Sequence, residues 1–107
     1  MAIQRKGKVY YNDIYAGLIY ENETEYVFEY DNSYNGKPIS LTMPITSTPY
    51  RSNILFPFFD GLIPEGWLLE IAYSKFNIDI RDRFNLLLNF CNDCIGAVSI
   101  INASEEE

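Results

Sequence analysis

The first half of the chain alternates apolar and polar residues with a period of two, which predicts β-strands. In segment 25–30 one face carries the aromatic residues and the other the acids: Tyr26, Phe28 and Tyr30 against Glu25 and Glu29. The same reading predicts strands over residues 8–11, 14–20 and 39–43, the last ended by Pro44. The pair Asn12-Asp13 favours a turn after the first strand. Gly17 interrupts the second, which indicates a bulge or a close approach of backbone.

The middle of the chain, from Pro44 to Gly66, contains four prolines, and this density excludes regular helix or central strand. The segment nevertheless carries many large apolar residues, among them Ile54, Leu55, Phe56, Phe58, Phe59, Leu62 and Ile63. Exposed loops rarely carry so much apolar area, so part of it packs against the body or binds a partner.

Helical spacing of apolar residues replaces the alternation after Gly66. It predicts a helix over 67–76, preceded by Pro64-Glu65, whose acidic side chain suits a helix start. We predict a second helix capped by Asp79 and stopped by Gly96, with an apolar stripe of Phe84, Leu87, Leu88 and Cys91. A closing strand follows over 97–101. The acidic tail, about 103–107, is expected to be disordered.

Strands, then helices, then a strand predict an α+β fold. The sheet is expected to be mainly antiparallel, a meander plus the closing strand, with two or more helices packed on one side. The length of 107 residues suits a single domain over 1–107.

Charge and composition exclude several classes of protein. The net charge of −7 opposes direct nucleic-acid binding, which depends on Lys and Arg replacing counterions. No segment approaches the roughly 20 apolar residues that cross a bilayer, and the N-terminus lacks the apolar region of a signal peptide, so we expect a cytoplasmic protein without a membrane partner. Histidine is absent, which removes the commonest general base and zinc ligand.

The remaining candidates for chemistry are sparse. Cys91 and Cys94 form a C-x-x-C, typical of a redox pair or half a zinc site, but two cysteines are too few for structural zinc and the pair lies at a predicted helix end. Asp60, Glu65 and Glu70 lie near one another in sequence, though nothing in their spacing brings them together. No phosphate-binding glycine loop is present. We therefore expect no enzyme activity, cofactor or metal site.

The most informative stretch, residues 58–67, reads F-F-D-G-L-I-P-E-G-W. It resembles the F-x-x-L-L-P-E-G segment of the HipA family of bacterial toxin kinases. Three other stretches are similar to family motifs in the same order: the opening hairpin around Val9–Asn12 with Ala16-Gly17, S-L-T-M-P at 40–44, and D-C-I-G-A-V at 93–98. The resemblance spans about residues 9–101 and implies that Cys94 is a packing position.

The resemblance also implies a function. HipA-type kinases continue into an ATP loop, a catalytic Asp and metal-binding residues, whereas this sequence ends at Glu107, after the first subdomain. A free-standing copy of that subdomain resembles HipS, the small member of three-component HipBST toxin–antitoxin systems. The resemblance implies an antitoxin that docks on a shortened kinase, HipT, and inhibits it. It further implies a ternary complex with HipB, the DNA-binding component.

Trp67 is the residue that we expect to matter most for such binding, with Glu65 and Gly66 beside it. It lies at a predicted helix start, at the edge of the apolar stripe, where its ring can bury roughly 150–250 Å² against a partner. The alternative is that Trp67 packs in the core. Phe59 and Leu62 either line the same surface or anchor the loop to the body.

Two other functions stay open from the sequence. One is a structural subunit that completes the kinase without inhibiting it. The other is a thiol oxidoreductase that uses Cys91 and Cys94.

Overall fold

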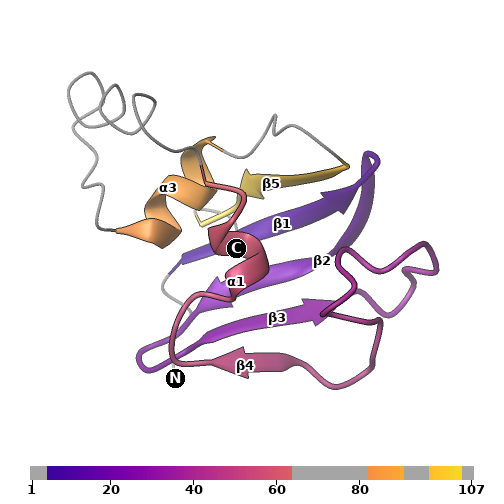
Figure 1. Ribbon diagram of the computed structural model, residues 1–107, viewed down its shortest axis with the longest axis horizontal. Helices are drawn as coiled ribbons and strands as arrows, with labels where there is room; N and C mark the ends of the chain where they lie inside the picture. Colours follow the sequence, from indigo (N-terminus) through magenta and orange to yellow (C-terminus); the bar gives the residue numbers. More distant parts are fainter. Residues whose placement is uncertain (1–4, 64–81, 91–96, 105–107) are drawn as a thin grey trace.

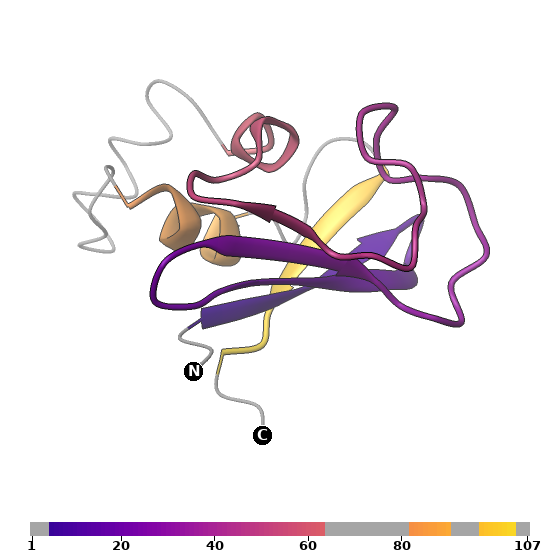
Figure 2. The same ribbon diagram turned by 90° about the horizontal axis from the view of Figure 1, so that it is seen from below.

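The computed structural model describes residues 5–63, 82–90 and 97–104 of the chain. The strands are β1 (Arg5–Tyr11), β2 (Ile14–Glu21), β3 (Tyr26–Tyr30), β4 (Tyr50–Ser52) and β5 (Val98–Asn102), and the helices are α1 (Pro57–Asp60) and α3 (Arg83–Phe90). All strands pair antiparallel in one sheet of order β4-β3-β2-β1-β5 (Figure 1). Both helices lie on the same face of the sheet (Figure 2). The predicted α+β class and the antiparallel meander with its closing strand are confirmed.

The core fills the space between the sheet and the two helices. Val9, Ile19, Phe28 and Ile100 point toward the helices from four neighbouring strands, and all four are fully buried. The helices contribute the other side of this core. Phe59 comes from α1, and α3 supplies four buried residues: Phe84, Leu86, Leu87 and Leu88. The alternation read from the sequence therefore identified the buried face of β3 correctly. The predicted helix 67–76 lies outside the described residues. So do Asp79 and Gly96, the predicted limits of the second helix.

The hairpin between β1 and β2 turns at the predicted pair. Asn12 and Asp13 have φ angles of 50° and 67°. Positive φ at both central positions is typical of a type I′ hairpin turn, and Asn and Asp accept this conformation more readily than most residues.

A β-bulge interrupts the pairing of β1 with β2, as the position of Gly17 predicts. Val9 pairs with Gly17 and Tyr10 with Tyr15, so Ala16 has no partner on β1. On its other side, Gly17 closely approaches β3: a Cβ atom there would lie 2.3 Å from the carbonyl oxygen of Glu29.

We predict that Gly17→Ala lowers the free energy of unfolding by about 1–3 kcal/mol, because the atom it meets belongs to the backbone and cannot rotate away. Gly61→Ala is the matched control, since its Cβ would lie 3.4 Å from its nearest neighbour and its φ is −70°. Urea unfolding of the two variants measures the difference. Equal stability would contradict the close approach.

Two predictions for the middle of the chain are wrong. Residues 39–43 do not form a strand; Ser40 and Met43 close a tight turn, and the fourth strand is β4, which begins only at Tyr50. The proline-rich segment was also predicted to contain no regular helix, but α1 lies within it and starts at Pro57. Proline is tolerated at the first helical position, where its missing N–H has no helical partner to lose.

The C-terminal strand is confirmed, but the predicted tail begins too early. Ala103 is 2% exposed and donates its N–H to the carbonyl oxygen of Lys6 (3.0 Å). Ser104 Oγ accepts a hydrogen bond from the N–H of Lys6 (3.1 Å). Pairing with β1 thus orders both residues. Neither helix in the described ranges is long and apolar enough to cross a bilayer.

Candidate partner-binding site

The predicted contact residues belong to the segment that follows α1. Glu65, Gly66 and Trp67 lie outside the described residues, so their predicted role stays a prediction. Phe59 and Leu62, which precede them, are described. The structure therefore tests the base of this segment and shows what surrounds it.

Phe59 is a core residue. Its side chain is fully buried, and its ring centroid lies 5.4 Å from that of Phe28 on the sheet. Phe58 and Phe56 pack against it with centroid distances of 5.3 and 6.2 Å. Phe59 thus anchors the loop to the body, one of the two roles considered for it, and its predicted contact with a partner stays a prediction.

Leu62 is half-buried and packs against the core from the turn after α1. Its N–H donates to the carbonyl oxygen of Phe59 (3.0 Å), and the next residue, Ile63, is 2% exposed. The chain is therefore fixed to the body up to Ile63. Leu62 keeps part of its surface in solvent, so its predicted contact with a partner stays open.

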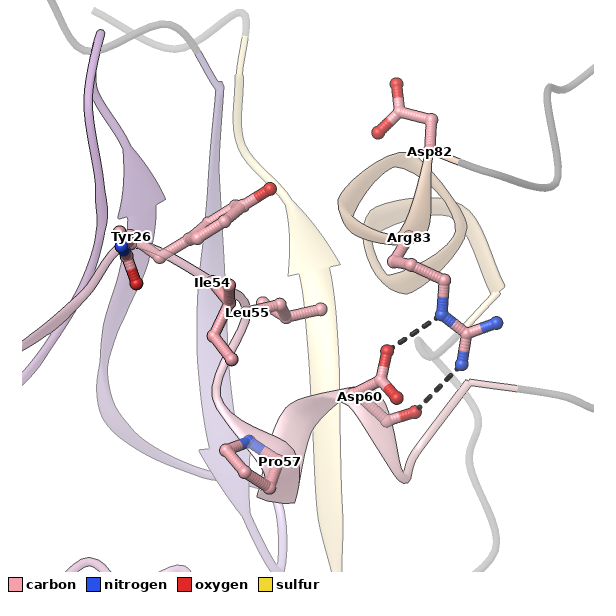
Figure 3. Close-up of a pocket in the computed structure, with 8 residues that line it drawn as sticks. Tyr26, Ile54, Leu55, Pro57, Asp60, Asp82 and Arg83 are labelled. Carbon is pink, nitrogen blue, oxygen red and sulfur yellow. Dashed lines mark hydrogen bonds and ion pairs between the residues drawn. The ribbon is translucent and has the colours of Figure 1, made fainter.

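A pocket of about 510 Å³ opens beside α1 (Figure 3). It is bounded by the end of β3, the chain after β4, α1 and the start of α3, through Tyr26, Asn53, Ile54, Leu55, Pro57, Asp60, Asp82 and Arg83. Ile54 is 65% exposed at this site. Burial, and secondarily the nearby Glu21, raises the pKa of Tyr26. The Tyr26 hydroxyl therefore stays protonated at neutral pH and can donate a hydrogen bond.

An ion pair joins the two helices across this pocket. Arg83 Nε donates to Asp60 Oδ1 (2.7 Å), and Arg83 Nη2 reaches the Asp60 carbonyl oxygen at 3.5 Å (Figure 3). Both side chains are about one-third to one-half exposed, so the pair adds modestly to stability. Its geometric effect is larger, because it holds together the two ends of the segment between α1 and α3.

A second cluster of charges, centred on Arg5, supports the same end of α3. Arg5 Nη1 donates to Asp82 Oδ2 (2.9 Å), and Arg5 also forms a two-point ion pair with Glu21 on β2. The guanidinium lies 5.4 Å from the centre of the Phe84 ring. Hydrogen bonding to Glu21, and then to Asp82, raises the pKa of Arg5 above its ordinary value. This cation therefore links β1, β2 and α3 at all physiological pH values.

Asp82 does two things at the start of α3. Its Oδ1 accepts the N–H of Asn85 (3.2 Å), a helix-capping hydrogen bond, while Oδ2 binds Arg5. We predict that Asp82→Ala lowers the free energy of unfolding by about 1–2 kcal/mol. Asp82→Asn keeps the cap and loses the charge, so it is expected to cost less. Thermal unfolding of both variants separates the contributions, and an Asn variant as unstable as the Ala variant would contradict the capping role.

Only some of the candidate groups for chemistry lie within the described residues. Asp60, which the sequence grouped with Glu65 and Glu70, is paired with Arg83; the two glutamates lie outside the described residues, as do Cys91 and Cys94. Within the ranges that the structure describes, no three residues of metal-ligating type come together. Sequence reasoning did not single out Arg83 or Arg5, and it named Ile54 only among the apolar residues of the proline-rich segment.

A sequence profile described as HipA N-terminal domain matches residues 7–101. The chain belongs to the HipA N-terminal domain family. The matched range includes almost the whole sheet, the pocket and the segment between α1 and α3. Membership of this family makes the chain a HipA-related toxin–antitoxin component.

Two relatives agree with this family and with the fold. An uncharacterized protein of Haemophilus influenzae is 41% identical over 96 residues, covering 90% of this chain and 91% of that protein. The solved N-terminal domain of HipA toxin superposes with a TM-score of 0.79 at 36% identity, covering 100% of this chain and 99% of that one. The HipA N-terminal domain fold therefore accounts for the described sheet and helices together.

Proposed function

We propose that this chain is an antitoxin-like protein that binds and inhibits a separate HipA-type serine/threonine kinase, of the HipT kind. The observation that carries the proposal is the extent of the match. The HipA N-terminal domain covers residues 7–101, and the domain makes up nine-tenths of the relative from Haemophilus influenzae. In that relative little sequence is left over for a kinase. A domain that is not joined to a kinase can act on one only as a separate chain.

The proposed contact surface is the end of the molecule where α1 and the start of α3 meet. Glu65, Gly66 and Trp67 follow Ile63 directly in sequence, and Ile63 is fixed in the core. We therefore place the proposed kinase contact beside α1, where the described residues end at Ile63. The pocket there offers exposed apolar area at Ile54 and charged groups at Asp60 and Arg83, a combination common at protein interfaces.

A non-catalytic role agrees with the side chains that the chain supplies. Histidine is absent from the whole sequence, and the charged groups around the pocket are engaged in ion pairs with one another. In the proposed mechanism the chain supplies a docking surface. Trp67 then presses near the active-site cleft of the kinase and blocks a productive arrangement of its ATP loop.

An autophosphorylation assay tests the proposal. The chain is titrated into a HipA-type kinase that lacks this domain. We expect activity to fall to near zero at one chain per kinase. Binding with unchanged or increased activity would instead favour a structural subunit that completes the kinase. Absence of binding would refute both. Addition of a HipB-like DNA-binding protein to the same mixture tests for a ternary complex.

A variant with both Cys91 and Cys94 replaced by Ser tests the remaining alternative. We expect full inhibition, because the proposal gives the thiols no role in binding. Loss of inhibition by a folded double variant would favour a thiol-dependent function.

A further inference from the structure

The connection between β3 and β4 holds a rigid turn at its centre. Residues 40–43 close it through a hydrogen bond from the N–H of Met43 to the carbonyl oxygen of Ser40 (3.1 Å). The Ser40 hydroxyl accepts a second one from the N–H of Thr42 (3.2 Å). On either side of the turn, Ile39 and Met43 are each 5% exposed and belong to the same core cluster as Phe59. The turn is therefore fastened to the body at both of its ends.

Tyrosine hydroxyls reinforce this attachment. Tyr30, 8% exposed, accepts the N–H of Ile39 (3.1 Å) and donates to the carbonyl oxygen of Met43, so one hydroxyl bridges both sides of the turn. Tyr50 on β4 donates to the carbonyl oxygen of Pro44 (2.5 Å). The backbone of the turn is thus fixed before any partner arrives, which lowers the entropic cost of binding.

Leu41 stands at the tip of this turn and is 100% exposed. The other large exposed apolar residues of the described chain are 39–65% exposed, so each still packs part of its side chain. Beside Leu41, Pro44 is exposed and Ile45 is 41% exposed. From Pro38 to Pro49 the sequence has no charged residue, although the chain carries a net charge of −7. Loss of charge around apolar anchors is characteristic of the centres of protein interfaces.

We infer that Leu41 is a preformed anchor that inserts into an apolar pocket on the kinase of the proposed function, and this inference rests on that function. The register of the sheet shows why one partner can reach it. Tyr26 pairs with Ser52 at the pocket end of β3, and Phe28 pairs with Tyr50 nearer the turn. The five residues of β3 span roughly 13 Å at 3.3 Å a residue. An interface of ordinary size, about 800 Å² on each partner, is roughly 30 Å across and contacts both ends.

The kinase fits this anchor better than a second copy of the chain. Three pockets among the described residues are a partly charged one beside α1 and two smaller ones with mainly polar linings, and none of these three offers a leucine an uncharged apolar socket. The turn also lies within residues 7–101, the range shared with the N-terminal domain of HipA toxin. A domain that acts as a separate chain needs contacts such as this one to hold the kinase without a covalent link.

The test is the affinity of the full chain for the kinase, measured by calorimetry with Leu41→Ser. We expect binding to weaken about 10- to 100-fold, the effect of leaving a leucine-sized pocket unfilled. The thermal midpoint of the free variant is expected to stay unchanged, because Leu41 makes no buried contact. Ile14→Ser is the matched control: Ile14 is 60% exposed at the β1–β2 hairpin, and its replacement should leave the affinity unchanged.

Three results would overturn the inference, and they are distinguishable. If the wild-type chain and the Leu41→Ser variant bind the kinase equally well, Leu41 is not an anchor, and the proposed function stands. If the wild-type chain does not bind the kinase at all, both are wrong. Self-association of the wild-type chain that Leu41→Ser abolishes would replace the kinase with a second copy as the occupant.

Discussion

Replacing Phe59 with alanine is expected to lower the free energy of unfolding by about 3–5 kcal/mol. The side chain is fully buried where α1 meets the sheet, and its ring contacts Phe28, Phe56 and Phe58. Removal leaves a cavity in the layer that holds α1 to β3, and the antiparallel strands below cannot collapse into it. Urea unfolding monitored by circular dichroism measures the loss.

Phe58→Ala is the control for this prediction. Because Phe58 is only half-buried, its replacement should lower the free energy of unfolding clearly less. Below its unfolding midpoint, the Phe59→Ala variant should still inhibit the kinase, since this side chain does not reach the surface. A variant that is as stable as wild type but no longer binds would contradict the core position of Phe59. It would restore the earlier view of this residue as a contact.

Replacing Trp67 with alanine is expected to abolish inhibition of the kinase while the domain stays folded. The residue lies outside the described residues, and the prediction rests on the resemblance to HipA-type proteins and on its place at a predicted helix start. Truncation of an aromatic hot spot costs about 2 kcal/mol or more, which is roughly 30-fold in affinity. Kinase autophosphorylation at a chain concentration that fully inhibits with wild type measures the effect.

Trp67→Phe separates a contact from a core role. A partner contact that depends on aromatic area should be partly rescued by phenylalanine, and the thermal midpoint should change little in either variant. An alanine variant that still inhibits fully would remove Trp67 from the mechanism. An alanine variant that unfolds, together with a phenylalanine variant that is stable and active, would place Trp67 in the core instead.

The meander was predictable because alternation and turn chemistry agree there. Tyr26, Phe28 and Tyr30 share the helix-facing side of β3 as the pattern predicts, and Asn12-Asp13 form the hairpin turn. Gly17 could be assigned to a bulge or close approach from its position alone. In each case a local rule and the long-range packing required the same structure.

The predicted strand at 39–43 failed for a reason that the pattern cannot show. A strand needs partners for the N–H of Ile39 and the carbonyl oxygen of Met43, and the hydroxyl of Tyr30 binds both. A side chain nine or more residues away thus replaced a neighbouring strand. Ile39 and Met43 are still buried, as alternation requires, but Leu41 between them faces solvent.

The candidate site was predictable in place more than in residues. The segment after α1 was identified from its resemblance to a known motif, whereas the residues that support it are charged pairs between distant parts of the chain. Arg5 binds Asp82 across 77 positions, and Arg83 binds Asp60 across 23. Single residues of this type give no periodic signal, because each pair depends on two elements packing together.

The pairing of β1 with β5 affects when the protein can fold during its synthesis. Of the described strands, β1 is the first to leave the ribosome and β5 is the last, yet Gly7 pairs with Asn102 and Tyr11 with Val98. Until residue 102 has been made, one edge of β1 has no partner strand, and such an edge can pair with other chains. The nascent chain is therefore exposed to this kind of aggregation from the synthesis of β1 until β5 has been made, and the sheet closes only then.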